Sequence, residues 1–236
     1  MQIRTNSCWY PQYAVDVVLC IDGTQTMNDI GCDGQSKLDS VKGVARRIGT
    51  DICETMNRYG KTVEKLRIRI IVFRDYWADG EHAMMASDFF RLPQQATEFE
   101  ACINNIRAEG GGDPPEDGLE ALAYAIRSKW DTEHSLSRSV IIVWSDAETH
   151  NLGFGSSSEF YPKGMPSDLD ELSDWWDNPA YVKERAKRLF LFAPDGGSWK
   201  YISDNWNCAW HIPSAAGNSL RDFDYQNILQ SIVHNV

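Results

Sequence analysis

Four short runs of the chain are rich in apolar and branched side chains and end at polar residues. They cover residues 14–21, 66–73, 139–144 and 188–192. The first and third runs are apolar almost throughout, which is typical of strands that are covered on both faces of a sheet. Helical patterns lie between the runs. This alternation predicts an α/β protein with a doubly wound, mostly parallel central sheet that is flanked by helices on both faces.

Three helices are marked by their caps or by apolar residues at three- and four-residue steps. The first begins at Ser36, which stands three residues before Asp39 as in a capping box. The second begins after Pro114 and Pro115, since proline suits the first turn of a helix. The third covers residues 223–233. The residues expected to be buried are Leu38, Val41, Ala45, Ile48, Ile52 and Met56 in the first helix, Leu119, Leu122, Ala123 and Ile126 in the second, and Tyr225, Ile228, Leu229, Ile232 and Val233 in the third.

The character of the sequence changes between residues 153 and 179. The stretch GFGSSSEFYPKGMP is followed by an acidic segment that contains Trp175 and Trp176. It predicts a long loop that leads into a short helix, and loops of this length are commonly functional. Either the segment binds a partner, or the two tryptophans pin it onto the body. Because the chain shows no linker or repeat, we predict that residues 1–236 form one domain with this insert.

The charge of the chain limits its partners. Asp and Glu number 34 against 23 Lys and Arg, so the formal net charge is -11. This charge repels nucleic acids and anionic membrane surfaces, whereas it suits cations, basic partners or plain solubility. The sequence has no apolar stretch near the ~20 residues of a membrane span, and its amino terminus lacks a secretory signal. We therefore expect a cytoplasmic protein that binds neither nucleic acid nor membrane.

The cysteines do not form a recognisable framework. The chain has 6 of them, and none stand in a C-x-x-C pair. Cys20 lies in a predicted strand, and Cys53 and Cys102 lie in helical patterns, where a free thiol packs as a small apolar group. The spacing favours neither a disulfide framework nor a zinc cluster.

Oxygen-bearing side chains follow two of the predicted strands and precede a predicted helix. The first strand ends in IDGTQTM, where Asp22, Thr24 and Thr26 alternate and so point to one side. Asp146 follows the third run, and Asp113 ends a GGGD turn before the second helix. The carboxyl ends of parallel strands meet at one edge of a sheet. Because hard divalent cations prefer such oxygen ligands, we predict that these five residues bind Mg²⁺, with Mn²⁺ or Ca²⁺ as the alternatives.

The same motifs resemble those of a known family. The pattern D-x-T-x-T, the stretch GGGDPPEDGLEAL and the stretch SDAETH are similar to a von Willebrand factor A (vWA) domain with a metal-ion-dependent adhesion site (MIDAS). More narrowly, IDGTQTM, FRDYWADGE, AEGGGDPPEDGLEAL and SDAETH resemble the A domains that accompany alpha-kinases, and bacterial relatives near tellurium-resistance-type and phosphorylation-linked gene clusters. The resemblance covers residues 13–236 and implies the Rossmann-like vWA fold.

The resemblance also implies roles for individual residues. Asp22, Thr24 and Thr26 match the first metal loop, and Asp146 matches the third. The second loop of adhesion-type members usually offers a threonine, whereas this chain has Asp113. The extra carboxylate either ligates the cation directly or holds a water molecule.

Three further residues are expected to support the ligands without contacting the ion. Asp75 lies in a match to the family's Y-R-D motif, in which Phe73 stands where tyrosine is common. We expect Asp75 to accept backbone hydrogen bonds or to pair with Arg74, and direct ligation is the alternative. His150 is expected to be a satisfied histidine beside the site, again with ligation as the alternative. Glu116 is the third candidate.

The favoured function is an intracellular, divalent-cation-dependent protein–protein interaction module. An acidic side chain of the partner would complete the coordination of the ion, as the resemblance implies, and a kinase, a phosphatase or a stress-response component is the expected partner. We do not expect an enzyme, because the chain lacks a G-x-S-x-G elbow, a Walker loop and an HExxH helix. A metal-dependent hydrolase or phosphatase-like enzyme and a metal-free scaffold are the alternatives. The sequence leaves the oligomeric state open.

Overall fold

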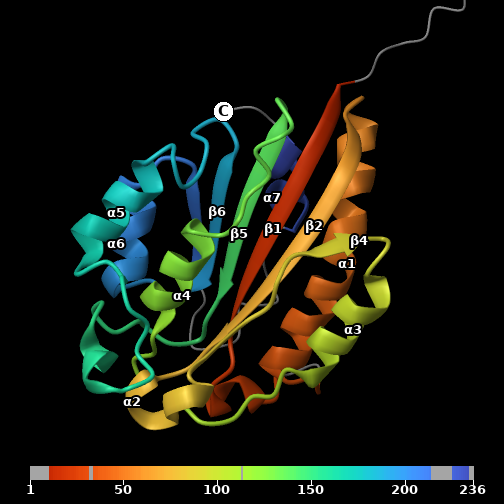
Figure 1. Cartoon of the computed structure of the whole chain (residues 1–236). Helices are drawn as coiled ribbons and strands as arrows, with labels where there is room; N and C mark the ends of the chain where they lie inside the picture. Colours follow the sequence, from red (N-terminus) through yellow and green to blue (C-terminus); the bar gives the residue numbers. More distant parts are fainter. Residues whose placement is uncertain (1–10, 32–33, 113, 214–224, 234–236) are drawn as a thin grey trace, which may run out of the picture.

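The computed structural model describes residues 11–31, 34–112, 114–213 and 225–233 of the chain. Within these ranges, seven strands form one sheet in the order β3-β2-β1-β5-β6-β7, and β4 also pairs with β2 (Figure 1). The strands are β1 (Gln12–Asp22), β2 (Thr62–Phe73), β3 (Met84–Ala86), β4 (Phe90–Leu92), β5 (Ser137–Trp144), β6 (Lys187–Ala193) and β7 (Ala209–Pro213).

Helices cover both faces of the sheet (Figure 1). One apolar core lies under α1, α3 and α7, and a second lies under α4, α5 and α6. No described helix is both long and apolar enough to cross a bilayer. The helices are α1 (Lys37–Arg58), α2 (Tyr76–Asp79), α3 (Ala96–Asn105), α4 (Gly118–Ile126), α5 (Leu169–Asp177), α6 (Gly197–Asn205) and α7 (Tyr225–Val233), and the 3₁₀ turns are η1 (Gln25–Asn28), η2 (Gly80–His82) and η3 (Phe154–Ser157).

The structure corrects the predicted fold class. The strands β1, β2, β5, β6 and β7 pair in parallel, but β3 and β4 both pair antiparallel with β2. The sheet is therefore mixed, and the prediction of a Rossmann-like, doubly wound, mostly parallel vWA sheet is wrong. The physical reason is that β3 and β4 are three-residue strands whose side chains stay partly or fully exposed, so the sequence carries no hydrophobic run to mark them.

The predicted helices form close to their expected bounds. Ser36 caps α1, because its hydroxyl oxygen accepts a hydrogen bond from the backbone N–H of Asp39 at 3.0 Å. The helix α4 begins at Gly118, and α7 begins at Tyr225. Phe223 and the side chain of Tyr225 lie outside the described residues. The remaining residues that we expected to be buried in these three helices are all buried.

The insert packs onto the body. It contains η3 and α5, and Trp176 of α5 is fully buried in the second core. The indole Nε1–H of Trp176 donates to the carbonyl of Asn207 at 2.9 Å. Its ring stacks on Trp206 with the centroids 5.4 Å apart. The sequence left packing by the tryptophans and partner binding equally open, and the buried position of Trp176 supports packing.

The described cysteines are unpaired. Cys20, Cys53 and Cys102 lie in β1, α1 and α3, as the pattern predicted, and they are free thiols. Burial raises the pKa of the Cys20 thiol to about 12, so this thiol is inert in the core.

Candidate metal centre

The loop after β1 carries a continuous chain of oxygen atoms. Asp22 Oδ1 accepts hydrogen bonds from the backbone N–H and the hydroxyl of Thr24, at 2.9 and 2.6 Å. The hydroxyl oxygens of Thr24 and Thr26 lie 3.1 Å apart, and the hydroxyl of Thr26 donates to Asp146 Oδ1 at 3.0 Å. The structure thus brings together four of the five predicted ligands.

These groups meet because β1 and β5 end side by side. Ile21 of β1 is level with Trp144 of β5, so Asp22 and the loop after Trp144 leave the sheet together. Ser145, which sequence reasoning missed, donates its hydroxyl hydrogen bond to Asp22 Oδ2 at 2.9 Å. Both oxygens of the Asp22 carboxylate are therefore held, and the residue is fully buried.

A lysine side chain also reaches this cluster. The ammonium Nζ of Lys37 lies 2.6 Å from Asp146 Oδ2 and 3.0 Å from Asp29 Oδ2. Lys37 is the first residue of α1 and is buried. It places one positive charge beside the predicted ligands. Sequence reasoning missed Lys37, because the local sequence pattern does not predict the direction of a lysine side chain that follows a helix cap.

The glycine-rich loop lies against the first loop. The backbone N–H of Gln25 donates to the carbonyl of Gly110 at 3.0 Å. Gly111 has a φ of +72°, and a Cβ at this position would lie 2.8 Å from the Thr24 side chain. Only glycine permits both this backbone conformation and this close approach. Asp113, the fifth predicted ligand, lies outside the described residues.

An open depression of about 400 Å³ lies between the two loops. Thr24, Thr26, Asp29, Gly111 and Glu116 are among its lining residues. A small ion with a carboxylate of a second molecule can enter a space of this size.

Buried carboxyl groups lie close together around this depression. Burial, together with the charge of Asp146, raises the pKa of Asp22 to about 6 despite the hydrogen bonds that lower it. Burial, followed by the charges of Asp22 and Asp75, raises the pKa of Glu116 to about 9. Glu116 Oε2 is buried and has no hydrogen-bond partner. Glu116 lines the depression together with Thr24 and Thr26, which is where a supporting residue is expected to lie.

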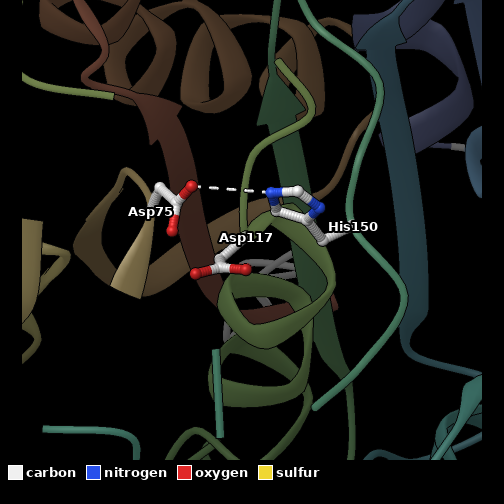
Figure 2. A group of neighbouring side chains, drawn as sticks. All are labelled: Asp75, Asp117 and His150. Carbon is white, nitrogen blue, oxygen red and sulfur yellow. Dashed lines mark ion pairs between the residues drawn. The ribbon is translucent and has the colours of Figure 1, made fainter. Parts of the chain in front are cut away.

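The other two supporting candidates lie together in a neighbouring group (Figure 2). Asp75 caps α2 by accepting backbone hydrogen bonds from Trp77 and Ala78, in line with the expectation for this residue. Its partner is not Arg74, whose guanidinium instead donates to backbone carbonyls, including that of Gly23 at 2.9 Å. His150 Nε2 lies 3.5 Å from Asp75 Oδ2.

Asp117 is a member of the same group that sequence reasoning missed. It is fully buried, and its Oδ2 accepts a hydrogen bond from the backbone N–H of Tyr76 at 2.6 Å. Burial, followed by the charge of Glu120, raises the pKa of Asp117 to about 7. Asp117 is the last residue of the GGGDPPED stretch, whose acidic end could have marked it as a candidate site residue. The sequence does not show, however, that this carboxylate faces the end of β2.

The residues that follow β1 and β5 fit a hard divalent cation. Asp22, Thr24, Thr26 and Asp146 offer oxygen donors alone, which is the donor set of Mg²⁺, Mn²⁺ and Ca²⁺. Their oxygen atoms already lie within hydrogen-bonding distance of one another, from Asp22 to Thr24, from Thr24 to Thr26 and from Thr26 to Asp146.

Comparison with known proteins gives one partial similarity in sequence. No family model matches the chain. Over 98 residues the chain is 31% identical to alpha-protein kinase vwkA of Dictyostelium discoideum. These residues make up 41% of this chain and 15% of the kinase, so the chain spans a small share of that protein. A similarity to part of an alpha-kinase is therefore present, as the motifs led us to expect.

Solved structures share the fold at low sequence identity. The PilB minor pilin from Streptococcus sanguinis matches 93% of this chain and 61% of its own, with 12% identity and a TM-score of 0.56. The pilus adhesin SpaC from Lactobacillus rhamnosus GG matches 93% of this chain and 30% of its own, with 12% identity and a TM-score of 0.53. Together with the mixed sheet, these neighbours point to a pilin-like fold rather than to the predicted Rossmann-like vWA fold.

Proposed function

We propose that this chain is a protein-binding module that depends on a divalent cation, with Mg²⁺ held by Asp22, Thr24, Thr26 and Asp146. The observation that carries the proposal is the continuous chain of oxygen atoms that joins the ends of β1 and β5. When bound there, Mg²⁺ would supply positive charge to a carboxylate of a partner protein. Asp113 would either join these ligands or hold a water molecule.

The motif resemblance supports the same proposal. The D-x-T-x-T and SDAETH motifs match the first and third loops of a metal-ion-dependent adhesion site, and these loops carry the four residues of the cluster. The similarity to an alpha-kinase supports a partner linked to phosphorylation. The names of the solved relatives, a pilin and an adhesin, favour a binding protein over an enzyme.

Metal titration tests the site. We expect isothermal calorimetry with MgCl₂ and MnCl₂ to give one binding event per chain, and Asp146→Ala and Thr26→Ala to weaken it at least about tenfold, since each removes an oxygen donor. Thr50→Ala is the matched control, because Thr50 is also an exposed threonine but lies within α1. Unchanged affinity in both site variants would make the metal-site proposal wrong.

Partner capture tests the function itself. The wild-type chain, fixed to a resin, should retain a protein from an extract in MgCl₂ and release it in EDTA, whereas Asp146→Ala should retain none. Capture that is indifferent to EDTA and to Asp146→Ala would support the metal-free scaffold. Hydrolysis of a generic phosphate ester that is lost in Asp146→Ala would support the enzyme instead.

A further inference from the structure

A second group of ligand-type atoms lies beside the first loop and shares none of its residues. Asp75, Asp117 and His150 each offer one ligand atom, and the three atoms lie within 4.8 Å of one another. Asp75 follows β2, Asp117 directly precedes α4, and His150 lies in the loop after β5. In Figure 2 the three side chains converge from these separate elements on one small space.

Each carboxylate uses one oxygen to hold the backbone. Asp75 Oδ1 accepts from the N–H of Trp77 at 2.6 Å, and Asp117 Oδ2 accepts from the N–H of Tyr76 at 2.6 Å. These hydrogen bonds fix both side chains and leave the second oxygen of each, Asp75 Oδ2 and Asp117 Oδ1, for another contact.

Two atoms of this group have no hydrogen-bond partner. Asp117 Oδ1 and His150 Nε2 are both buried and form no hydrogen bond, and Asp117 is fully buried. Buried polar atoms without a partner are rare in folded proteins, because burial removes the hydrogen bonds that water would supply. An ion that contacts these atoms would satisfy them.

The separation between His150 and Asp75 fits two ligands of one ion. His150 Nε2 and Asp75 Oδ2 lie 3.5 Å apart, and they do not form a hydrogen bond that would satisfy Nε2. Two ligands that each lie about 2.1 Å from a tetrahedral ion are about 3.4 Å apart. The observed separation therefore needs little adjustment.

The imidazole is held in place. Its ring stacks on Phe154 with the centroids 3.8 Å apart and the planes at 10°. The backbone N–H of His150 donates to the carbonyl of Glu116 at 2.8 Å. A ligand that is fixed before the ion arrives loses little conformational freedom on binding.

We propose that Asp75, Asp117 and His150 form a second cation site, which takes a borderline transition-metal ion such as Zn²⁺. The imidazole nitrogen distinguishes it from the all-oxygen site of Asp22 and Asp146, since imidazole suits Zn²⁺ and carboxylates alone suit Mg²⁺. With three protein ligands, the ion keeps a coordination position for water or a partner group. The second site does not depend on the function proposed for the first.

Another group of two carboxylates and a histidine, Asp131, Glu133 and His134, is a weaker candidate. Asp131 already pairs with Lys65 at 2.6 Å, and the Glu133 side chain is 82% exposed. This group supplies its own positive charge, so it needs no ion. It provides the control for the test below.

Zinc binding by the full chain tests the proposal. We expect equilibrium dialysis against ZnCl₂ in excess MgCl₂ to leave one Zn²⁺ per chain. His150→Phe, which keeps an aromatic ring against Phe154, and Asp117→Asn, which keeps an acceptor for Tyr76, should each weaken Zn²⁺ binding at least about tenfold. Thr26→Ala and His134→Phe should bind Zn²⁺ as the wild type does.

The metal-free variants separate a ligand from a structural residue. If Asp117 is a ligand, metal-free Asp117→Asn should melt no lower than the metal-free wild type, because the change removes an unpaired buried charge. A lower melting temperature with unchanged Zn²⁺ affinity would make Asp117 a structural residue and overturn the proposal. Wild type that retains no Zn²⁺ would also overturn it. Zinc that is lost in Thr26→Ala would assign the ion to the first site, and loss in His134→Phe would assign it to the other group.

Discussion

Single residues set the charge at the proposed Mg²⁺ site. Asp146 is 3% exposed at its side chain and already pairs with the ammonium of Lys37. Hydrogen bonds to Asp146 and then Asp29 raise the pKa of Lys37 against the opposing effect of burial, so the lysine stays charged. A divalent cation bound at Asp146 as proposed would lie beside this charge, and Lys37 would then tune the affinity of the site.

Replacing Lys37 tests this effect. We expect Lys37→Met to tighten Mg²⁺ binding about tenfold, because a like charge near the ion is removed. Calorimetry gives the affinity. Lys42→Met is the matched control, since Lys42 is equally buried on α1 but donates only to the carbonyl of Ile106 at 2.7 Å. Weaker binding in Lys37→Met would mean that Lys37 positions Asp146 rather than competing with the ion.

At the scale of elements, α5 is part of the core and not an appendage. Leu172 and Trp176 are fully buried under the sheet together with side chains of α4 and α6. The segment therefore stabilises the fold that holds the loops, whatever it also contacts outside. The sequence left a packed helix and a partner-binding segment equally open.

A substitution in α5 separates these roles. Trp176→Ala should lower the free energy of unfolding by about 3–5 kcal/mol, because it leaves a large cavity in the second core. Phe160→Ala in the same insert should change it by less than about 0.5 kcal/mol, since Phe160 is 46% exposed. Denaturant titration measures both. A Trp176→Ala chain of wild-type stability that captures no partner would instead make the insert a recognition segment.

At the scale of the whole molecule, buried carboxylates gather at the carboxyl end of the parallel strands. Asp22, Asp75, Glu116 and Asp117 are all buried there, in a chain of net charge -11. Burial of like charges opposes folding unless protonation or a cation removes the repulsion, and a cation would keep these carboxylates ionised. The stability of the molecule is therefore expected to depend on divalent cations.

Thermal unfolding checks this dependence. At free Mg²⁺ about 100 times the dissociation constant, binding should stabilise the fold by about 2.7 kcal/mol, which raises the melting temperature by about 5–10 °C for a chain of this size. Calorimetric scans in MgCl₂ and EDTA give the shift, and Asp146→Ala should show none. An equal rise in NaCl of the same ionic strength would mean that screening, and not a bound ion, is responsible.

The sequence determined the parts that depend on neighbours along the chain. Periodic apolar residues marked β1, β2, β5 and β6, the Ser36 cap marked the start of α1, and the D-x-T-x-T motif marked the oxygen cluster. It also led us to expect Mg²⁺, one domain, a cytoplasmic location and an acidic partner, and these remain predictions. Apolar periodicity and helix caps depend only on the backbone geometry of a single helix or strand, so they can be recognised from the sequence alone.

Only the tertiary structure decided which distant groups meet. In the folded chain, β3 and β4 pair antiparallel with β2. Lys37 forms an ion pair with Asp146, and Asp117 lies close to Asp75 and His150. The members of the last group, Asp75, Asp117 and His150, come from three separate parts of the chain. Such contacts depend on the path of the whole chain and on the burial that fixes it, and no local pattern encodes either.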